Sequence, residues 1–236
     1  MSRLTLVGTV HRDPRGLPRL VETLERLGPD ILTLEFSIYG FRYRQKRKKL
    51  LRQRLLEGLR EIQGADSLKA GELKVLLRSA GIGGLAALLE LPFEYKGATF
   101  YSHRHHLPLL YLDVSSYSRQ LLSHLDELLC PANLKKLIAF ERSSLQEAVE
   151  REYFLAKNLL VDGKGSLWRK FIPEQEEWEK RDRMMAERIK KVLAKYPTAQ
   201  VVHIGGWQHL LAQQGTLFNL LEDLNPKRIL LGHLQL

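Results

Sequence analysis

The stretch Leu4-Thr5-Leu6-Val7-Gly8-Thr9-Val10-His11 decides the fold of this chain, because it predicts a buried strand that stops at a tight turn. In open α/β sheets, the ends of the strands are where side chains face a ligand crevice. His11 is therefore expected at the mouth of such a crevice, on rigid backbone.

The same arrangement returns near the other end of the chain. A predicted strand at 200–204 runs into Gly205-Gly206-Trp207-Gln208-His209, so both places have a strand followed by Gly-x-x-His. The spacing from His11 to Glu35 is 24 positions (35 − 11), and that from His209 to His233 is also 24 (233 − 209). We interpret the two as copies of one β-α-β unit that pack about a pseudo-twofold, so that the turns meet. Two unrelated strand-end turns with incidental histidines remain the alternative.

Hydrophobic periodicity extends this pattern over the whole chain. Strands are expected at 4–7, 31–34, 107–112, 200–204 and 228–231, and helices at 17–27, 41–62, 68–79, 118–160 with a break near Pro131, 174–196 and 210–224. A break is expected at the glycines of 81–84. The first strand, helix and strand form a crossover unit with parallel neighbours, which brings His11 and Glu35 side by side.

These elements predict an α/β fold with a central mixed, partly parallel sheet built from N- and C-terminal β-α-β repeats. The expected organisation is a single domain over 1–236, with a largely helical insertion at about 41–92 and 118–196.

The composition is that of a soluble globular protein, with 236 residues, 44% hydrophobic and 27% charged. No apolar run approaches the roughly 20 residues that span a bilayer, and the chain begins with a strand rather than a secretory leader. One cysteine, Cys130, excludes an intramolecular disulfide and a cysteine-based zinc cluster. We expect a cytoplasmic protein without a transmembrane segment.

The formal net charge of +10 is concentrated in one segment. Its cations are Arg42, Arg44, Lys46, Arg47, Lys48, Lys49, Arg52, Arg54 and Arg60. An apolar stripe is added by Leu50, Leu51, Leu55 and Leu59, and it favours a helix with a solvated basic face. A nucleic-acid partner is not expected. A second hypothesis places this helix beside the site, where it screens or steers anionic ligands.

Several motifs occur in an order that resembles a known family. They are Gly8-Thr9-Val10-His11, the strand-end Glu35, Glu94 with Ala98, Asp113, the run Lys180-Arg181-Asp182-Arg183-Met184-Met185-Ala186, and Gly206-Trp207-Gln208-His209. The chain resembles TraB/PrgY-like proteins, which belong with Tiki, ChaN and erythromycin-esterase-like proteins in one superfamily. The resemblance covers almost the whole chain. The family's usual acidic residue before the arginine is Lys180 here, and the last turn has Gly-Gly-Trp-Gln-His in place of small residues.

The resemblance implies an α/β core with both Gly-x-x-His motifs at its site. For the Tiki branch it implies metal-dependent peptidase activity, and TraB-like proteins are linked to shutting down peptide pheromones. The esterase branch uses a histidine to activate water without an established need for metal.

Two histidines and a carboxylate are suitable ligands for a divalent ion. His11, Glu35 and His209 would hold Zn, Mn or Co with open positions, and the ion would generate hydroxide near neutral pH. Without metal, His11 would take a proton from water while Glu35 orients the histidine. Arg181 suits an oxyanion or a substrate carboxylate. Its alternative role is a salt bridge to Glu35 or Asp182 that ties its helix to the sheet.

The expected site therefore has a catalytic group and a substrate-binding group. The first contains His11, Glu35, Arg181 and His209, and the second contains Gly8, Thr9, Glu94, Asp113, Asp182 and Gly206. The expected function is a TraB/Tiki-type hydrolase, metal-assisted, that cleaves an amide or ester bond in a small-molecule or peptide substrate. The alternative is a non-catalytic protein that binds an anionic or haem-like ligand in the same cleft. A homo-oligomer is compatible with either function.

Overall fold

The computed structural model describes residues 3–63, 70–140, 143–162 and 175–232, and it has a five-stranded sheet at its centre. The strand order is β3-β2-β4-β1-β5, with β1 (Leu4–Thr9), β2 (Ile31–Leu34), β3 (Leu109–Tyr111), β4 (Val201–Gly206) and β5 (Lys227–Leu230). The expected α/β fold is confirmed. All the pairings between these strands are parallel, whereas a mixed sheet was expected.

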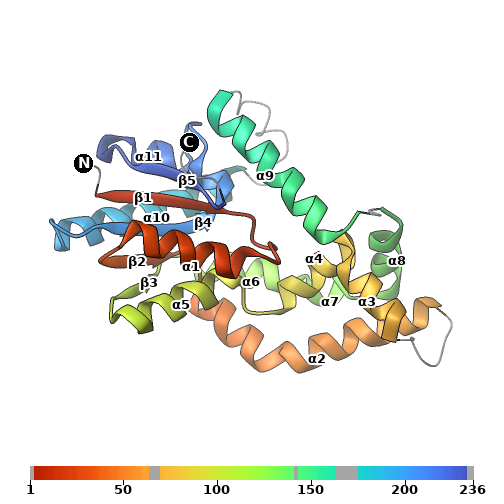
Figure 1. Cartoon of the computed structure of the whole chain (residues 1–236). Helices are drawn as coiled ribbons and strands as arrows, with labels where there is room; N and C mark the ends of the chain where they lie inside the picture. The colour runs from red at the N-terminus through yellow and green to blue at the C-terminus, as the bar shows by residue number, and fades with distance from the viewer. Residues whose placement is uncertain (1–2, 64–69, 141–142, 163–174, 233–236) are drawn as a thin grey trace.

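Helices cover both faces of the sheet, which is why β1, β2 and β4 are buried along their whole length. Helices α1 (Gly16–Leu27) and α5 (Phe93–His105) pack together on one face, and α10 (Gln175–Lys195) and α11 (Leu217–Leu220) lie on the other (Figure 1). The face on which a right-handed crossover places its helix depends on the direction in which the chain moves along the sheet. Two crossovers that run in opposite directions therefore place their helices on opposite faces.

The two Gly-x-x-His turns leave from adjacent strands, as expected. Strand β4 pairs with β1, so that Gly8 lies opposite Gly205 and Thr9 opposite Gly206. The expectation that β1 and β2 are neighbours is wrong, because β4 lies between them. The two repeats are thus interleaved. Exchanging β1 with β4 and β2 with β5 gives the same order, β2-β4-β1-β5, read from the opposite edge. His233 lies outside the described residues.

The second repeat does not contain the continuous helix expected at 210–224. Its place is taken by the 3-10 turns η2 (Trp207–Leu210) and η3 (Glu222–Leu224) on either side of the short α11. Gly215 adopts φ +86°, which interrupts a helix. Thr216 then caps a new start by accepting a hydrogen bond from the amide of Asn219.

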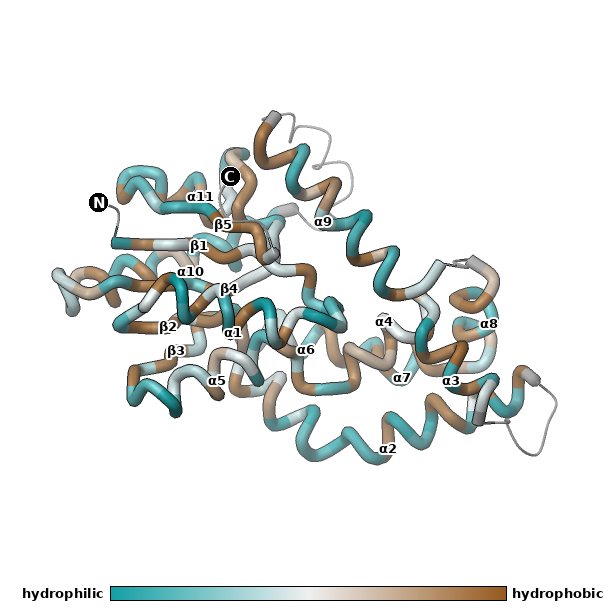
Figure 2. Tube along the Cα trace, viewed as in Figure 1, coloured by the Kyte–Doolittle hydropathy of each residue, from teal (hydrophilic) through white to brown (hydrophobic). Residues whose placement is uncertain are grey.

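A second apolar core lies beside the sheet domain. It joins α2 (Ile38–Gln63) and α4 (Ala80–Leu89) to α6 (Ser115–Ser123), α7 (Leu125–Leu128) and α8 (Pro131–Phe140), with α3 (Ala70–Arg78) next to them (Figure 1). Leu51, Leu55 and Leu59 are buried in it, while the rest of α2 is mostly hydrophilic (Figure 2). Helix α9 (Leu145–Asp162) and α10 instead contribute to the core around the sheet.

The expected break at the glycines of 81–84 is also wrong, because these residues belong to α4. A Cβ on Gly81 would lie 2.6 Å from the carbonyl oxygen of Leu137. The glycines therefore allow close helix packing rather than ending the helix. Among the described residues, no helix is both long and apolar enough to cross a membrane.

Candidate functional site

The predicted site residues meet at the carboxyl edge of the sheet. Thr9 ends β1, and Glu35 and Asp113 follow β2 and β3. His209 follows β4 on the 3-10 turn η2. Because all the strands are parallel, their carboxyl ends share one edge, and this edge is where open α/β sheets bind ligands. Topology thus gathers residues that are up to 200 positions apart in the chain.

His11 is the accessible member of the site. Its Nδ1 lies 2.9 Å from Oε1 of Glu94, and its Nε2 lies 3.9 Å from Oε2 of Glu35. The His11 side chain is 50% exposed, whereas each carboxylate is 4% exposed. Desolvation works against the charged imidazolium, but the Glu94 carboxylate, helped by Glu35, outweighs it and raises the pKa of His11 to about 9.

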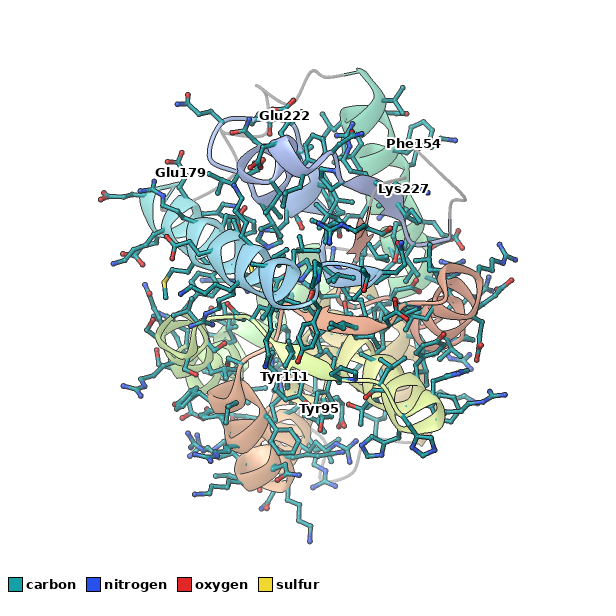
Figure 3. The ribbon with its side chains drawn as sticks, turned by 90° about the vertical axis from the view of Figure 1, so that its left-hand side faces the viewer. Tyr95, Tyr111, Phe154, Glu179, Glu222 and Lys227 are labelled. Carbon is teal, nitrogen blue, oxygen red and sulfur yellow. The ribbon has the colours of Figure 1, made fainter. Side chains whose placement is uncertain are left out.

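Glu94 is held in place by its neighbours on α5 and β1. Thr9 Oγ1 lies 2.7 Å from Glu94 Oε1. The next residue, Tyr95, places its ring 4.9 Å from that of Phe36, which follows Glu35. Tyr95 also lies next to Tyr111 of β3 (Figure 3). The aromatic contacts therefore help to fix the positions of Glu35 and Glu94, which lie on either side of the His11 ring. The second oxygen of Glu94, Oε2, is buried without a hydrogen-bond partner among the described residues.

Glu35 is a fixed carboxylate that is saturated with donors. The amide of Gly206 donates to its Oε2 at 2.6 Å, and Arg181 donates to its Oε1 at 2.5 Å. Nε2 of His209 lies 3.2 Å from the same Oε1. Burial raises the pKa of Glu35, but the charges of Arg181 and His209 outweigh burial and hold it well below its usual range.

Arg181 joins α10 to the ends of β2 and β3. Its Nε donates to Asp113 Oδ1 at 2.7 Å, in addition to its bond to Glu35, and the guanidinium stacks 4.3 Å from the ring centroid of Tyr117. The residue is 7% exposed, and the charges of the two carboxylates raise its pKa although desolvation opposes them. This geometry favours the salt-bridge role over a role in contacting an oxyanion.

His209 is completely buried between two carboxylates. Its Nδ1 lies 2.6 Å from Oδ1 of Asp182, and its ring stacks on Trp178 with a centroid distance of 4.6 Å. Desolvation opposes the charge, yet Asp182 and Glu35 raise the pKa of His209 to about 10. Asp182 also accepts a hydrogen bond from the amide of Leu217 at 2.7 Å, which attaches α11 to α10.

Sequence reasoning missed His203, which lies inside β4. Its Nδ1 is 3.0 Å from Thr33 Oγ1, and its Nε2 is buried without a hydrogen-bond partner among the described residues. Burial lowers its pKa to about 3, so the ring is neutral. A Cβ on Gly205 would lie 3.2 Å from this Nε2 and 2.8 Å from Glu35 Oε2. The sequence feature that could have identified His203 is its position as a lone histidine within a predicted apolar strand.

The remaining predicted residues divide into two roles. Gly206 uses its amide to hold Glu35. Gly8 has a packing role, because a Cβ there would lie 2.9 Å from the Cα of Trp207. The structure therefore gathers His11, Thr9, Glu35, Glu94, Asp113, Arg181, Asp182 and His209 into one network.

The predicted metal ligands do not form a free donor set in this arrangement. Both ring nitrogens of His209 face carboxylates, and both oxygens of Glu35 accept from protein donors. Within the described ranges, no group of three or more His, Cys, Asp and Glu side chains is arranged to hold a metal ion. The metal requirement stays a prediction.

Comparison with known protein families, curated proteins and solved structures found no match for this chain.

Proposed function

We propose that this protein is a hydrolase that cleaves an amide or ester bond in a small or peptide-like substrate, with His11 as its acid–base residue. One observation carries the proposal. The ring of His11 is oriented by the buried carboxylate of Glu94 at 2.9 Å, while half of its side chain is exposed beside Glu35. An accessible imidazole oriented by a carboxylate is the recurring arrangement for general base catalysis.

In the proposed reaction, the neutral ring of His11 keeps its proton on Nδ1 and donates it in a hydrogen bond to Glu94, so that the lone pair lies on Nε2. The 3.9 Å from Nε2 to Glu35 Oε2 exceeds a direct hydrogen bond, so a water molecule between them can contact both atoms. Nε2 takes a proton from this water as its oxygen bonds to the substrate carbonyl. The same proton then passes to the leaving amine or alkoxide as the carbon–heteroatom bond breaks.

The role of His11 as a general base predicts that kcat/KM depends on pH. Because the pKa of His11 is raised to about 9, only a small fraction of the ring is neutral at pH 7. The value of kcat/KM should therefore increase about tenfold per pH unit up to about pH 9 and then level off.

The raised pKa also favours a second candidate, the binding of an anionic ligand. At neutral pH His11 is an imidazolium at an exposed position, which attracts a carboxylate or phosphate group. In that case affinity should fall as the pH rises through about 9, which is the opposite trend to that expected for hydrolysis.

The test uses chromogenic esters and short peptide amides with the wild type, His11→Asn and His105→Asn. His105 is a suitable control because it is a histidine beside a carboxylate, Glu25, at the surface. We expect His11→Asn to lose at least 100-fold in kcat/KM, while His105→Asn keeps the wild-type value. Equal turnover in all three proteins, or none in the wild type over the whole panel, would contradict the hydrolase proposal. Metal analysis of the purified protein, and activity after chelation, test the metal requirement separately.

A further inference from the structure

A hollow lies at the junction of α2 with the segment between α4 and α5. The hollow has a volume of about 350 Å³, and it is lined by Arg44, Gln45 and Lys48 of α2 and by Leu91. None of these residues belongs to the network around His11. The lining thus combines two cationic side chains, one amide and one apolar wall.

Arg44 is a half-buried cation without a carboxylate partner among the described residues. Its Nε donates to the carbonyl of Leu88 at 3.0 Å and its Nη1 to that of Gly40 at 3.3 Å. Desolvation lowers its pKa, which reflects the cost of removing this charge from water. The Leu88 carbonyl is at the negative end of α4, but a neutral carbonyl offsets only part of a full charge. The pocket wall therefore has uncompensated positive charge.

Lys48 adds to this excess. Its Nζ lies 2.6 Å from Oε2 of Glu90, and Arg52 contacts the other oxygen of the same carboxylate. One negative charge is thus shared by two cations. With Arg44 included, the group has three positive charges and one negative charge, a net excess of +2.

We propose that this hollow is a binding site for a small phosphate-bearing anion, with Arg44 and Lys48 contacting the phosphate oxygens. A dianion matches the excess of +2, and the guanidinium fork and the ammonium are both groups that proteins use to bind phosphate. Leu91 and the amide of Gln45 contact the part of the ligand next to the phosphate. The site does not depend on the hydrolase activity proposed above.

The experiment measures the binding of inorganic phosphate by calorimetry and amide chemical shifts, with acetate at equal ionic strength as the comparison anion. The variants are Arg44→Gln, Lys48→Gln and the control Arg42→Gln. Arg42 is an exposed arginine two residues before Arg44 and has no ion pair in the described part of the chain. Arg42→Gln therefore lowers the net charge by the same amount as Arg44→Gln or Lys48→Gln. Lys48 is 41% exposed, so this variant is expected to fold even if Arg44→Gln does not.

We expect the wild type and Arg42→Gln to bind phosphate with the same Kd and more tightly than acetate. Lys48→Gln and Arg44→Gln should each weaken phosphate at least 10-fold, with shift changes centred on Gln45 and Leu91. The proposal is overturned if phosphate does not bind, if acetate binds equally well, or if Arg42→Gln weakens phosphate as much as Lys48→Gln does. The last result would indicate a diffuse basic surface instead of a pocket.

Discussion

At the scale of single residues, the contrast between His11 and the other charged groups defines the site. His11 is half exposed, whereas Arg181 and His209 are buried and both contact the buried Glu35. The packing of an exposed side chain at a strand end contributes little to stability. Substituting His11 by Asn should remove activity, and near pH 10, where the imidazolium charge no longer contributes, it should change the free energy of unfolding by less than about 0.5 kcal/mol, as measured by urea denaturation. Unfolding of this variant would show that the histidine is structural.

Glu94 should control the protonation of His11. Glu94→Gln keeps the shape of the side chain but removes the charge that raises the pKa of His11 to about 9. We expect the His11 pKa to fall by at least one unit, measured by NMR titration of the ring protons. The pH at which kcat/KM levels off should fall with it. An unchanged ring titration would show that Glu94 does not act on His11.

Arg181 is expected to stabilise the fold through its salt bridges to Glu35 and Asp113. Two roles were expected for Arg181, contact with an anion or a salt bridge. In the first case, Arg181→Ala would reduce the rate but not the stability. Because it is bonded to Glu35 and Asp113 and is 7% exposed, its loss leaves two buried carboxylates unpaired. We expect a destabilisation of about 3 to 5 kcal/mol in urea denaturation. If Arg181→Ala has the stability of the wild type but a reduced turnover rate, the result would support the contact with an oxyanion instead.

At the scale of elements, the glycines of β4 make room for the site. A Cβ on Gly205 would lie 2.8 Å from Glu35 Oε2, so Gly205→Ala must displace the carboxylate or the strand. We expect a loss of about 1 to 3 kcal/mol in stability, together with reduced turnover. Gly71→Ala on α3 is the control, because a Cβ there has no atom within 4 Å. It should raise stability by about 0.5 kcal/mol, and equal effects at both positions would contradict the steric argument.

At the scale of the whole molecule, three histidines with shifted pKa values give stability an optimum near pH 6.5. The pKa values of His209 and His11 are raised to about 10 and 9, so their contributions are complete below pH 6.5 and are lost as the pH rises toward 10. His203, with its pKa lowered to about 3, contributes above pH 6.5 and loses that contribution as the pH falls. Urea denaturation at pH 4.5, 6.5 and 9.5 measures both limbs.

The variant His11→Gln provides the matched comparison for this profile. It should flatten part of the alkaline limb and leave the acid limb unchanged, because His203 is untouched. A wild-type stability that rises steadily from pH 6.5 to 9.5 would show that His209 is not held as an imidazolium.

Much of the fold could be predicted from local pattern. The strand at 31–34 matches β2, and the expected helices at 17–27 and 41–62 match α1 and α2 within a few residues. These elements have strong hydrophobic periodicity and clear stop signals. The helix through Gly81 and the broken helix after His209 were missed. In the first case close packing against Leu137 made glycines favourable in a helix, and in the second Gly215 adopted a left-handed conformation.

The residue types that end the strands follow from the sequence alone, because Gly-x-x-His and the strand-end Glu35 and Asp113 are local features. Parallel topology then requires those ends to share one edge. Only the tertiary structure decided that β4 lies between β1 and β2 and that Glu94, from α5, is the partner of His11. The physical reason is that burial and charge pairing depend on contacts across the fold. These contacts leave His11 accessible, make His209 a buried imidazolium and keep His203 neutral, differences that the three residues do not show in the sequence.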